Sequence, residues 1–287
     1  MKKIAINGFG RIGRLTFRNI LNKSSLDVIA INDLTDTATL AHLLKYDSAH
    51  GVFPGSVDYT PNSLIVNGKE IIITAVRNPS ELPWGKLGID MVIESTGLFT
   101  SKEQLEMHIT AGAKKVGLSA PAKENVKTIV LGVNDHLLTN TDKSFSNASC
   151  TTNCLAPMMK VLNDNFGVKK GYMLTVHAYT NDQNLVDNFH KKYRRGRSAA
   201  LNMVITETGA GKAVTKALPS FEGKLTSNAI RVPVPNGSLA ILNLNLSCKT
   251  SVVGINTVMK KYALEGDLVE QIKYEINDPK NDNSRVI

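Results

Sequence analysis

Short apolar runs alternate with longer amphipathic stretches along the first half of the chain. The pattern predicts strands at 3–7, 26–31, 71–75, 91–95, 115–118 and 128–131, and helices at 11–22, 37–46 and 102–110. Asn67–Gly68 lies between two further apolar runs, and this pair favours a tight β-hairpin. Because alternating strands and helices are typical of a doubly wound, mostly parallel α/β sheet, we expect one such domain over residues 1–149.

The second half of the chain has a different pattern. It predicts strands at 172–179, 225–232 and 238–246, and helices at 209–218 and 255–274. Apolar and polar side chains alternate along 238–246, which indicates one buried face. We therefore expect a second, α+β domain with a mostly antiparallel sheet over residues 150–287. Since this boundary falls at Cys150, we expect that residue in a cleft between the domains, where substrates usually bind.

A glycine-rich turn follows the first predicted strand. Residues 8–13 read GFGRIG, the G-x-G-x-x-G pattern, between a strand and a helix. In this context Gly8 permits the tight turn, Gly10 lets a pyrophosphate approach the backbone, and Gly13 lets the helix pack against the strand. Asp33 ends the second strand, where an acidic side chain binds the ribose hydroxyls of NAD and repels the 2′-phosphate of NADP. The sequence therefore predicts an NAD site.

Cys150 stands in the first turn of a predicted helix, with Ser149 as its N-cap. The positive end of the helix dipole favours the thiolate, which is the nucleophilic form of cysteine. His177 ends a predicted strand just before a polar loop, so its imidazole could act as a base beside the thiol. The spacing does not show that the two side chains meet, and a buried structural cysteine with a core histidine remains the alternative.

Composition limits the possible classes of protein. A chain of 287 residues with 42% hydrophobic residues can form two domains, and no apolar run is long enough for a membrane span. The chain starts with a strand pattern rather than a signal peptide, so we expect a cytoplasmic protein. Its three cysteines predict neither a disulfide framework nor a metal site; we expect a structural role for Cys154 and a packing role for Cys248.

The net charge of +9 admits nucleic acid or phosphate-bearing small molecules as partners. Basic residues are scattered, apart from the run Lys191–Arg197, and no aromatic-interleaved RNA-binding motif is present. We therefore favour small phosphorylated ligands over nucleic acid.

Several segments resemble the phosphorylating glyceraldehyde-3-phosphate dehydrogenase family of glycolysis: AINGFGRIGR, KYDSAHG, ESTGLF, SNASCTTNCLAP, HAYTNDQ, RRGRSAALN, TGAGKAV and RVPVPN. SNASCTTNCLAP and HAYTNDQ are the most specific, and the segments extend along nearly the whole chain. The resemblance implies NAD-dependent conversion of glyceraldehyde 3-phosphate and inorganic phosphate to 1,3-bisphosphoglycerate, through a cysteine hemithioacetal and a thioester. It also implies a homotetramer.

The resemblance further implies roles for individual residues. Cys150 is the nucleophile and His177 its general base. The residues around NAD are Asn7, Gly8, Gly10, Arg11, Ile12, Asp33, Arg77, Ser95, Thr96 and Ser119. Thr180, Asp182 and Arg231 match positions that bind the phosphate of the substrate, and Ser149, Thr151, Thr208 and Gly209 match those for inorganic phosphate, with Arg195 in the same anion-binding region.

The chain also departs from the family pattern. Family members continue for several tens of residues with further strands and a long helix, so we expect either an incomplete sequence or a truncated variant. Phe189 and Gly237 stand where many relatives have proline and valine. Two alternatives follow: the sister activity on erythrose 4-phosphate, and an inactive nucleotide-binding homologue.

Overall fold

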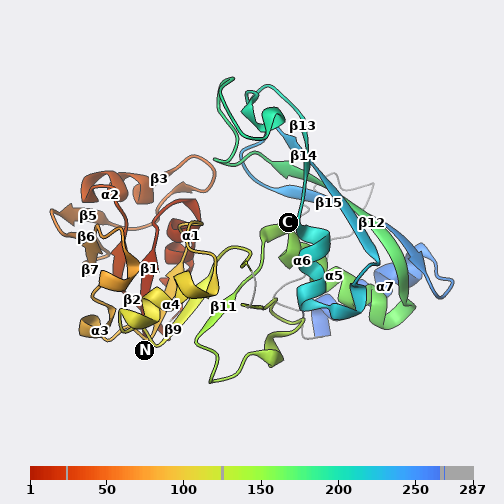
Figure 1. The fold of residues 1–287 in the computed structure, drawn as a ribbon, viewed down its shortest axis with the longest axis horizontal. Coiled ribbons are helices and arrows are strands. Elements are labelled where there is room, and N and C mark those ends of the chain that lie inside the picture. Colours follow the sequence, from red (N-terminus) through yellow and green to blue (C-terminus); the bar gives the residue numbers. More distant parts are fainter. Residues whose placement is uncertain (24, 124–125, 266–267, 269–287) are drawn as a thin grey trace. The chain divides into compact units, whose positions relative to one another are not determined.

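The computed structural model describes residues 1–23, 25–123, 126–265 and 268. It consists of two compact units: residues 1–128 with 138–148, here the first unit, and 129–137 with the chain from Ser149 onward, here the second unit (Figure 1). The structure therefore divides the chain between Ala148 and Ser149, and it adds 129–137 to the second unit.

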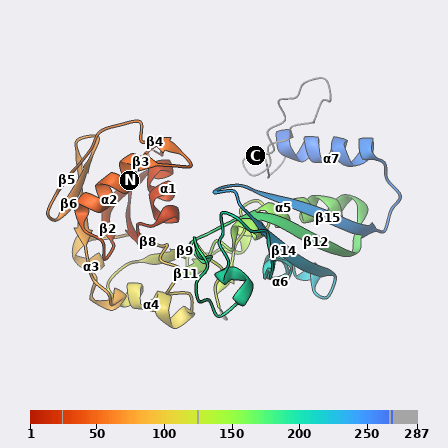
Figure 2. The same ribbon diagram turned by 90° about the horizontal axis from the view of Figure 1, so that it is seen from above.

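Within the described residues of the first unit, nine strands form one sheet in the order β10-β11-β9-β8-β1-β2-β7-β6-β5. They are β1 (Lys2–Asn7), β2 (Leu26–Asn32), β5 (Val57–Thr60), β6 (Ser63–Val66), β7 (Lys69–Thr74), β8 (Met91–Glu94), β9 (Lys115–Leu118), β10 (Lys127–Thr128) and β11 (Ser144–Ser146). Neighbours from β10 to β7 are parallel, and β7, β6 and β5 form an antiparallel meander at the edge that ends in β5. Strands β5 and β6 of this meander are labelled in Figure 2.

The remaining elements of this unit are α1 (Arg11–Ile20), α2 (Thr37–Lys45), β3 (Tyr46–Asp47), β4 (Gly51–Val52), the 3₁₀ helix η1 (Pro79–Glu81), α3 (Trp84–Leu87) and α4 (Lys102–Thr110). Adjacent residues of β1 enter different cores: Ile4 and Ile6 pack in a cluster with Phe17 of α1, whereas Ala5 packs in a cluster with Trp84. Both faces of the sheet are therefore covered, which is why its central strands are continuous apolar runs. The predicted doubly wound fold is confirmed.

Local sequence signals fix several boundaries of the first unit. Asn67 and Gly68 connect β6 and β7 with φ of 51° and 78°, the left-handed pair that the tightest hairpin turns require. Ser101 begins α4 with a capping box to Gln104. The prediction of a strand at 128–131 is wrong, because β10 ends at Thr128. Asn134 Oδ1 accepts the Val130 N–H at 2.8 Å, so a local turn replaces the ladder there.

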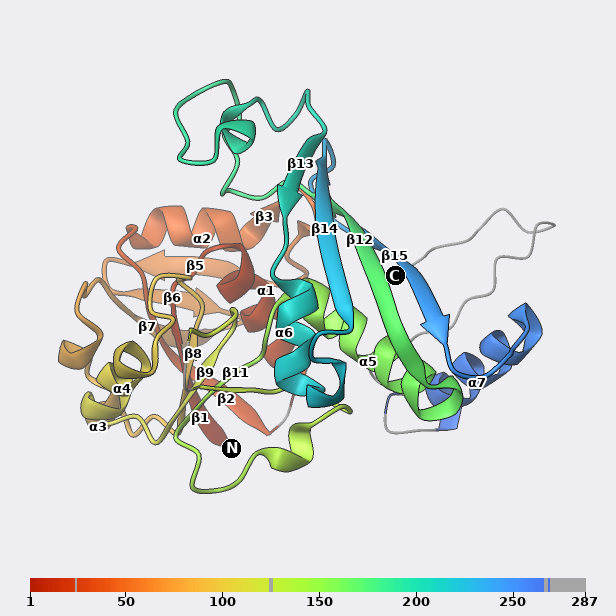
Figure 3. The same ribbon diagram turned by 45° about the vertical axis from the view of Figure 1, so that its right-hand side comes forward.

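Within its described residues, the second unit contains a four-stranded sheet in the order β13-β14-β12-β15 (Figure 3). Its strands are β12 (Val168–Ala178), β13 (Val204–Glu207), β14 (Leu225–Val232) and β15 (Ser238–Leu246). The pair β12–β14 is parallel and the other two pairs are antiparallel. Its helices are η2 (Asp135–Leu137), α5 (Cys150–Phe166), η3 (Tyr193–Gly196), α6 (Ala210–Ala217), η4 (Pro219–Phe221) and α7 (Val252–Glu265). The predicted mixed α+β architecture, with a mostly antiparallel sheet, is confirmed.

One face of this sheet packs against helices α5 and α6. Met173, Thr175 and Ala229 on that face are buried, and His177 and Arg231 lie on it as a register pair of β12 and β14. The opposite face carries Leu239 and Ile241, which are 48% and 47% exposed. The period-two pattern of β15 thus separates a helix-covered face from an open one, although its inward leucines are only half-buried.

Three expectations about the second unit need correction or fall outside the described residues. β12 begins at Val168 rather than 172, because 168–171 continue the ladder with β15. Helix α7 spans Val252–Glu265, and the rest of the predicted helix at 255–274 lies outside the described residues except for Leu268. Cys248 is not a packing residue: β15 ends at Leu246 and the thiol is exposed.

Gly237, one of the departures from the family pattern, lies in the turn before β15 with φ of 83°. A glycine adopts this left-handed backbone at little cost, whereas a β-branched residue would be strained. The turn conformation therefore explains why glycine suits this position.

Candidate functional site

The predicted nucleotide-binding residues gather at one edge of the first unit's sheet. Asn7, Asp33, Arg77, Ser95 and Ser119 end or follow five strands that are neighbours in the sheet, β1, β2, β7, β8 and β9. Because the carboxyl ends of parallel strands share an edge, residues far apart in the sequence meet there. In doubly wound sheets ligands bind outside this edge.

The glycine turn has the geometry that a pyrophosphate site needs. Gly8 has φ of 90°, and a Cβ there would lie 2.8 Å from Thr96 Cγ2 and Thr96 N. A Cβ on Gly13 would lie 2.1 Å from the carbonyl oxygen of Gly8, so the third glycine allows α1 to pack against the turn. Nothing lies within 4 Å of a Cβ on Gly10, which leaves its backbone open to a ligand. Gly10 is the N-cap of α1 and makes no side-chain cap, so the positive end of the helix faces this opening.

Asp33 supports the turn as well as offering an acceptor to a ribose. Its Oδ2 accepts the Phe9 N–H at 2.7 Å and its Oδ1 accepts the Thr35 N–H at 3.0 Å. The side chain remains partly exposed, and each carboxylate oxygen can accept a further bond. With the open glycine backbone and the exposed Ile12 and Arg77, these residues fit an NAD molecule.

His108 has a context that sequence reasoning missed. His108 is fully buried, and its Nε2 lies 3.0 Å from Glu94 Oε2. Glu94 is also fully buried and accepts a bond from the side chain of Asn7. The only local signal was a histidine on the inward side of an amphipathic helix, which does not name its partner.

The second candidate site lies at the start of α5 in the second unit. Ser149 is the N-cap, as predicted, and its Oγ accepts the Thr152 N–H at 3.1 Å. Cys150 is the first helical residue and its side chain is exposed. Thr151 Oγ1 lies 4.0 Å from the sulfur. The thiol is therefore accessible, and it lies at the positive end of a 17-residue helix.

The structure brings Cys150 and His177 together. Cys150 Sγ lies 3.4 Å from His177 Nε2, so the two side chains, whose contact the spacing left open, are neighbours. The hydrogen bond with His177 is the largest of the influences that lower the pKa of Cys150 to about 7, against an opposing effect of burial. His177 Nδ1 lies 2.7 Å from the carbonyl oxygen of Ala178, which orients the ring so that Nε2 faces the sulfur.

Arg231 contacts His177, the imidazole member of the Cys150–His177 pair. Its Nη1 donates to the Ala178 carbonyl at 2.8 Å and lies 2.9 Å from His177 Nδ1. Its Nε is buried and has no hydrogen-bond partner among the described residues. Burial, followed by the positive charge of Arg195, lowers the pKa of Arg231. A desolvated guanidinium with a free donor and a second guanidinium nearby is a strong attractor for an anion.

Arg195 is held by an ion pair with Asp182 and by a hydrogen bond from its Nε to Thr206 Oγ1 at 3.0 Å. His190 Nε2 also lies 3.6 Å from the Asp182 carboxylate. Partial burial alone would raise the pKa of Asp182, but the hydrogen bond and charge of Arg195 lower it overall. The Asp182 carboxylate thus holds the Arg195 guanidinium in position.

Other predicted phosphate residues lie on elements beside this cluster. Thr180 follows β12, and its carbonyl accepts the Gln183 N–H in a turn at 2.9 Å. Gly209 is the N-cap of α6, and Thr208 Oγ1 accepts the Ala210 N–H at 3.2 Å. Among the described residues, no hydrogen bond joins Thr180, Thr208 or Gly209 to Cys150, so their roles stay predictions.

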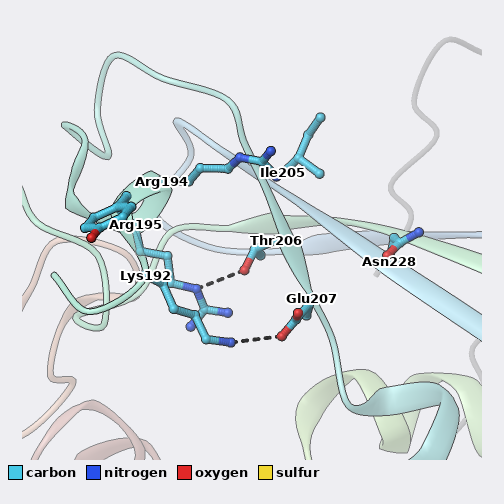
Figure 4. Close-up of a pocket in the computed structure, with 8 residues that line it drawn as sticks. Lys192, Arg194, Arg195, Ile205, Thr206, Glu207 and Asn228 are labelled. Atoms are coloured by element: carbon cyan, nitrogen blue, oxygen red, sulfur yellow. Dashed lines mark hydrogen bonds and ion pairs between the residues drawn. The ribbon is translucent and has the colours of Figure 1, made fainter.

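A cavity of about 370 Å³ lies beside Arg195, between the 3₁₀ helix η3 and strands β13 and β14 (Figure 4). Its lining includes Lys192 and Arg194, and Lys192 forms an ion pair with Glu207, another lining residue. In the basic run Lys191–Arg197, Lys192, Arg195 and Arg197 each pair with a carboxylate. Carboxylates thus compensate three of the five cations of this run.

Comparisons with known proteins identify the family of this chain. Residues 2–102 match the family model of the glyceraldehyde 3-phosphate dehydrogenase NAD binding domain, and residues 149–280 match that of the C-terminal domain. The chain belongs to the glyceraldehyde-3-phosphate dehydrogenase family. The resemblance inferred from SNASCTTNCLAP and HAYTNDQ is therefore confirmed.

Curated relatives of the family align along most of this chain. The glyceraldehyde-3-phosphate dehydrogenase of Clostridium pasteurianum is 54% identical over 267 residues, covering 92% of this chain and 80% of the relative. Glyceraldehyde-3-phosphate dehydrogenase 1 of Bacillus subtilis is 53% identical over 267 residues, covering 93% and 79%. The enzyme of Geobacillus stearothermophilus is 52% identical over 273 residues, covering 95% and 81%. The aligned region is thus shorter than each relative.

Two kinds of feature are absent from the described residues. No cluster of three or more His, Cys, Asp or Glu side chains that could hold a metal ion occurs in the described part of the chain. No helix in that part is long and apolar enough to cross a membrane.

The lowered pKa of Cys150 predicts selective alkylation. Because the thiolate reacts and the thiol does not, the rate of modification by iodoacetamide should rise with pH and reach half its maximum near pH 7. Burial and the Cys150 charge raise the pKa of Cys154, so that residue should react slowly at neutral pH. Mass spectrometry of peptides after timed alkylation measures both rates. Equal rates at Cys150 and Cys154 at pH 7 would contradict the assigned electrostatics.

Proposed function

We propose that this chain is a phosphorylating, NAD-dependent glyceraldehyde-3-phosphate dehydrogenase of glycolysis. The single observation that supports this proposal most strongly is the contact between Cys150 and His177. The desolvated guanidinium of Arg231 lies against Nδ1 of the same imidazole. A nucleophile, a base and an anion-binding group are the parts that oxidation of a phosphorylated aldehyde requires. Family membership agrees with this assignment.

The chain is an NAD-dependent dehydrogenase, in line with its match to an NAD binding domain. Asn7, Gly8, Gly10, Arg11, Ile12, Asp33, Arg77, Ser95, Thr96 and Ser119 would hold the cofactor at the carboxyl edge of the first unit's sheet. NAD, when bound, supplies the hydride acceptor for the oxidation. The carboxylate of Asp33 disfavours the 2′-phosphate of NADP by charge repulsion.

In the first step the Cys150 thiolate attacks the aldehyde carbon. A C–S bond forms, and the π electrons of the carbonyl move to its oxygen, giving a hemithioacetal after protonation. The backbone N–H of Cys150 at the start of α5 and the protonated His177 ring can stabilise the negative oxygen. As the hemithioacetal is oxidised to a thioester, His177 Nε2 accepts the hydroxyl proton.

In the last step an oxygen of inorganic phosphate attacks the thioester carbon. The C–S bond breaks and returns the thiolate, whose pKa of about 7 makes it a good leaving group. Phosphate rather than water must reach the carbon, so the site needs a second anion position beside the one for the substrate. Ser149, Thr151, Thr208, Gly209 and Arg195 would supply it, while Thr180 and Arg231 would hold the substrate phosphate.

Asp182 acts differently from its neighbours in this scheme. A carboxylate repels a phosphate, and Asp182 is already paired with Arg195 and close to His190. We assign it the role of holding the Arg195 guanidinium in place for the anion rather than contacting the anion itself.

Assembly and location complete the proposal. The open face of the second unit's sheet exposes Ile205, Leu239 and Ile241 by 60%, 48% and 47%, and such apolar surface supports association with further copies in a homotetramer. Sedimentation analysis tests the assembly. The glycolytic role of the family supports a cytoplasmic enzyme.

The function is tested by following NADH formation at 340 nm. We expect NADH only when glyceraldehyde 3-phosphate, NAD and inorganic phosphate are all present. Erythrose 4-phosphate at the same concentration should be converted more slowly. A preference for the four-carbon aldehyde would move the assignment to the sister activity, and NAD binding without NADH formation would identify an inactive nucleotide-binding protein.

A further inference from the structure

A chain of buried polar side chains runs beneath the carboxyl ends of β1 and β8 in the first unit. Trp84 Nε1 donates to His108 Nδ1 at 3.0 Å, and His108 Nε2 lies 3.0 Å from Glu94 Oε2. The other side of the same carboxylate reaches Thr96, whose N–H and hydroxyl donate to Glu94 Oε1 at 2.8 and 2.5 Å. Trp84, His108 and Glu94 are fully buried. The indole of α3 is thus connected to the loop that follows β8.

The donor and the acceptor of every hydrogen bond in this series of side chains are fixed. An indole N–H can only donate, so His108 Nδ1 accepts and His108 Nε2 carries the proton that it donates to Glu94. The Asn7 amide donates to Glu94 Oε2 at 2.5 Å, while Asn7 Oδ1 accepts from Asn32 at 2.7 Å, so this amide cannot be turned without losing a bond. Each oxygen of Glu94 therefore accepts two donors, and no member can reverse its role alone.

The same carboxylate controls the path of the glycine turn. Thr96 is packed against Gly8 so closely that a Cβ on Gly8 would lie 2.8 Å from its side chain and its N–H. Ser95 Oγ donates to the Gly8 carbonyl at 2.7 Å. Movement of Glu94 would shift Thr96, and with it Gly8 and the side chain of Asn7, all of which belong to the proposed NAD site.

Stability alone does not favour this arrangement. Burying a carboxylate and an imidazole is costly, and a well-packed apolar pair of similar volume often gives equal or greater stability. We propose that Glu94 and His108 are positioning residues for NAD: without touching the nucleotide, they hold Thr96 and Asn7 in the binding geometry, and Trp84 fixes the required histidine tautomer. This inference rests on the proposed NAD-dependent function.

The test compares NAD affinity with folding stability in the full-length chain. Glu94→Gln keeps the volume but places an NH₂ group against either the two donors of Thr96 or those of Asn7 and His108. We expect the NAD dissociation constant, measured by calorimetry, to rise about 10- to 100-fold, since a buried donor loses its partner. Trp84 is the member of this hydrogen-bonded series that lies farthest from the glycine turn. Because Trp84→Phe removes the donor that fixes the His108 tautomer, it should raise the NAD dissociation constant about threefold or more.

Ser63→Ala is the matched control. Ser63 is 2% exposed and its hydroxyl lies 2.6 Å from Thr60 Oγ1, on the antiparallel edge of the same sheet. This variant should lower the melting temperature without changing NAD affinity. If Glu94→Gln and Trp84→Phe behave in the same way, with unchanged affinity, the two residues are merely structural and the inference fails.

A measurement on the unmodified protein covers the case in which Glu94→Gln does not fold. Trp84 is the sole tryptophan of the sequence, so the indole N–H gives a single cross-peak in a ¹H–¹⁵N spectrum. Saturation with NAD should shift this peak. An unshifted peak together with unchanged affinity of Trp84→Phe would overturn the inference, whereas an unmodified protein that binds no NAD would overturn the proposed function instead.

Discussion

Replacing Cys150 by serine should lower the turnover number about 10⁴-fold or more, a loss of about 5 kcal/mol in transition-state stabilisation. The hydroxyl of serine stays protonated near neutral pH, so it cannot replace the thiolate that forms the hemithioacetal. NAD affinity should stay unchanged, because the proposed NAD residues belong to the first unit. Steady-state NADH formation and NAD calorimetry measure the two effects.

Cys154→Ser is the control for this variant. Cys154 lies one helical turn farther along α5 and has a raised pKa, so it should not act as a nucleophile. Its replacement should leave turnover within about twofold of the unmodified chain. Activity retained by Cys150→Ser, or lost only in Cys154→Ser, would show that the nucleophile has been misassigned.

Replacing His177 by asparagine should lower turnover about 10²- to 10⁴-fold at pH 7, the usual contribution of a general base. Two effects combine. Asparagine cannot accept the hydroxyl proton, and the pKa of Cys150 loses its largest lowering influence and should return toward the ordinary 9.0. The alkylation profile of Cys150 should therefore move to higher pH, and part of the lost activity should return above pH 9 as the thiolate forms unaided.

His136→Asn serves as the matched control, because His136 is exposed in η2 of the same unit. It should leave both the turnover number and the alkylation profile unchanged. If His177→Asn also leaves the profile in place, His177 does not set the ionisation of Cys150, and the proposed base would have to be sought elsewhere.

Much of the fold could be predicted because its signals are local. The strands and helices of the first unit follow from short apolar runs and amphipathic spacing, and Asn67–Gly68 and Ser149 identified a hairpin and an N-cap that the structure contains. Errors occurred where a side chain competes with the ladder, as Asn134 does after β10. They also occurred where exposure depends on distant elements, as for Cys248.

The candidate sites divide in the same way. The sequence by itself determined the glycine turn, the acidic residue that follows β2, and a cysteine at a helix start, since each depends on neighbours within a few residues. Only the tertiary structure decided that Cys150 meets His177, 27 residues away, and that Arg231, 54 residues from His177, reaches the same ring through the register of β12 and β14. It also decided that His108 is connected to the glycine turn through Glu94. Sheet register and helix packing set such contacts, and neither has a signature in the residues adjacent to the site.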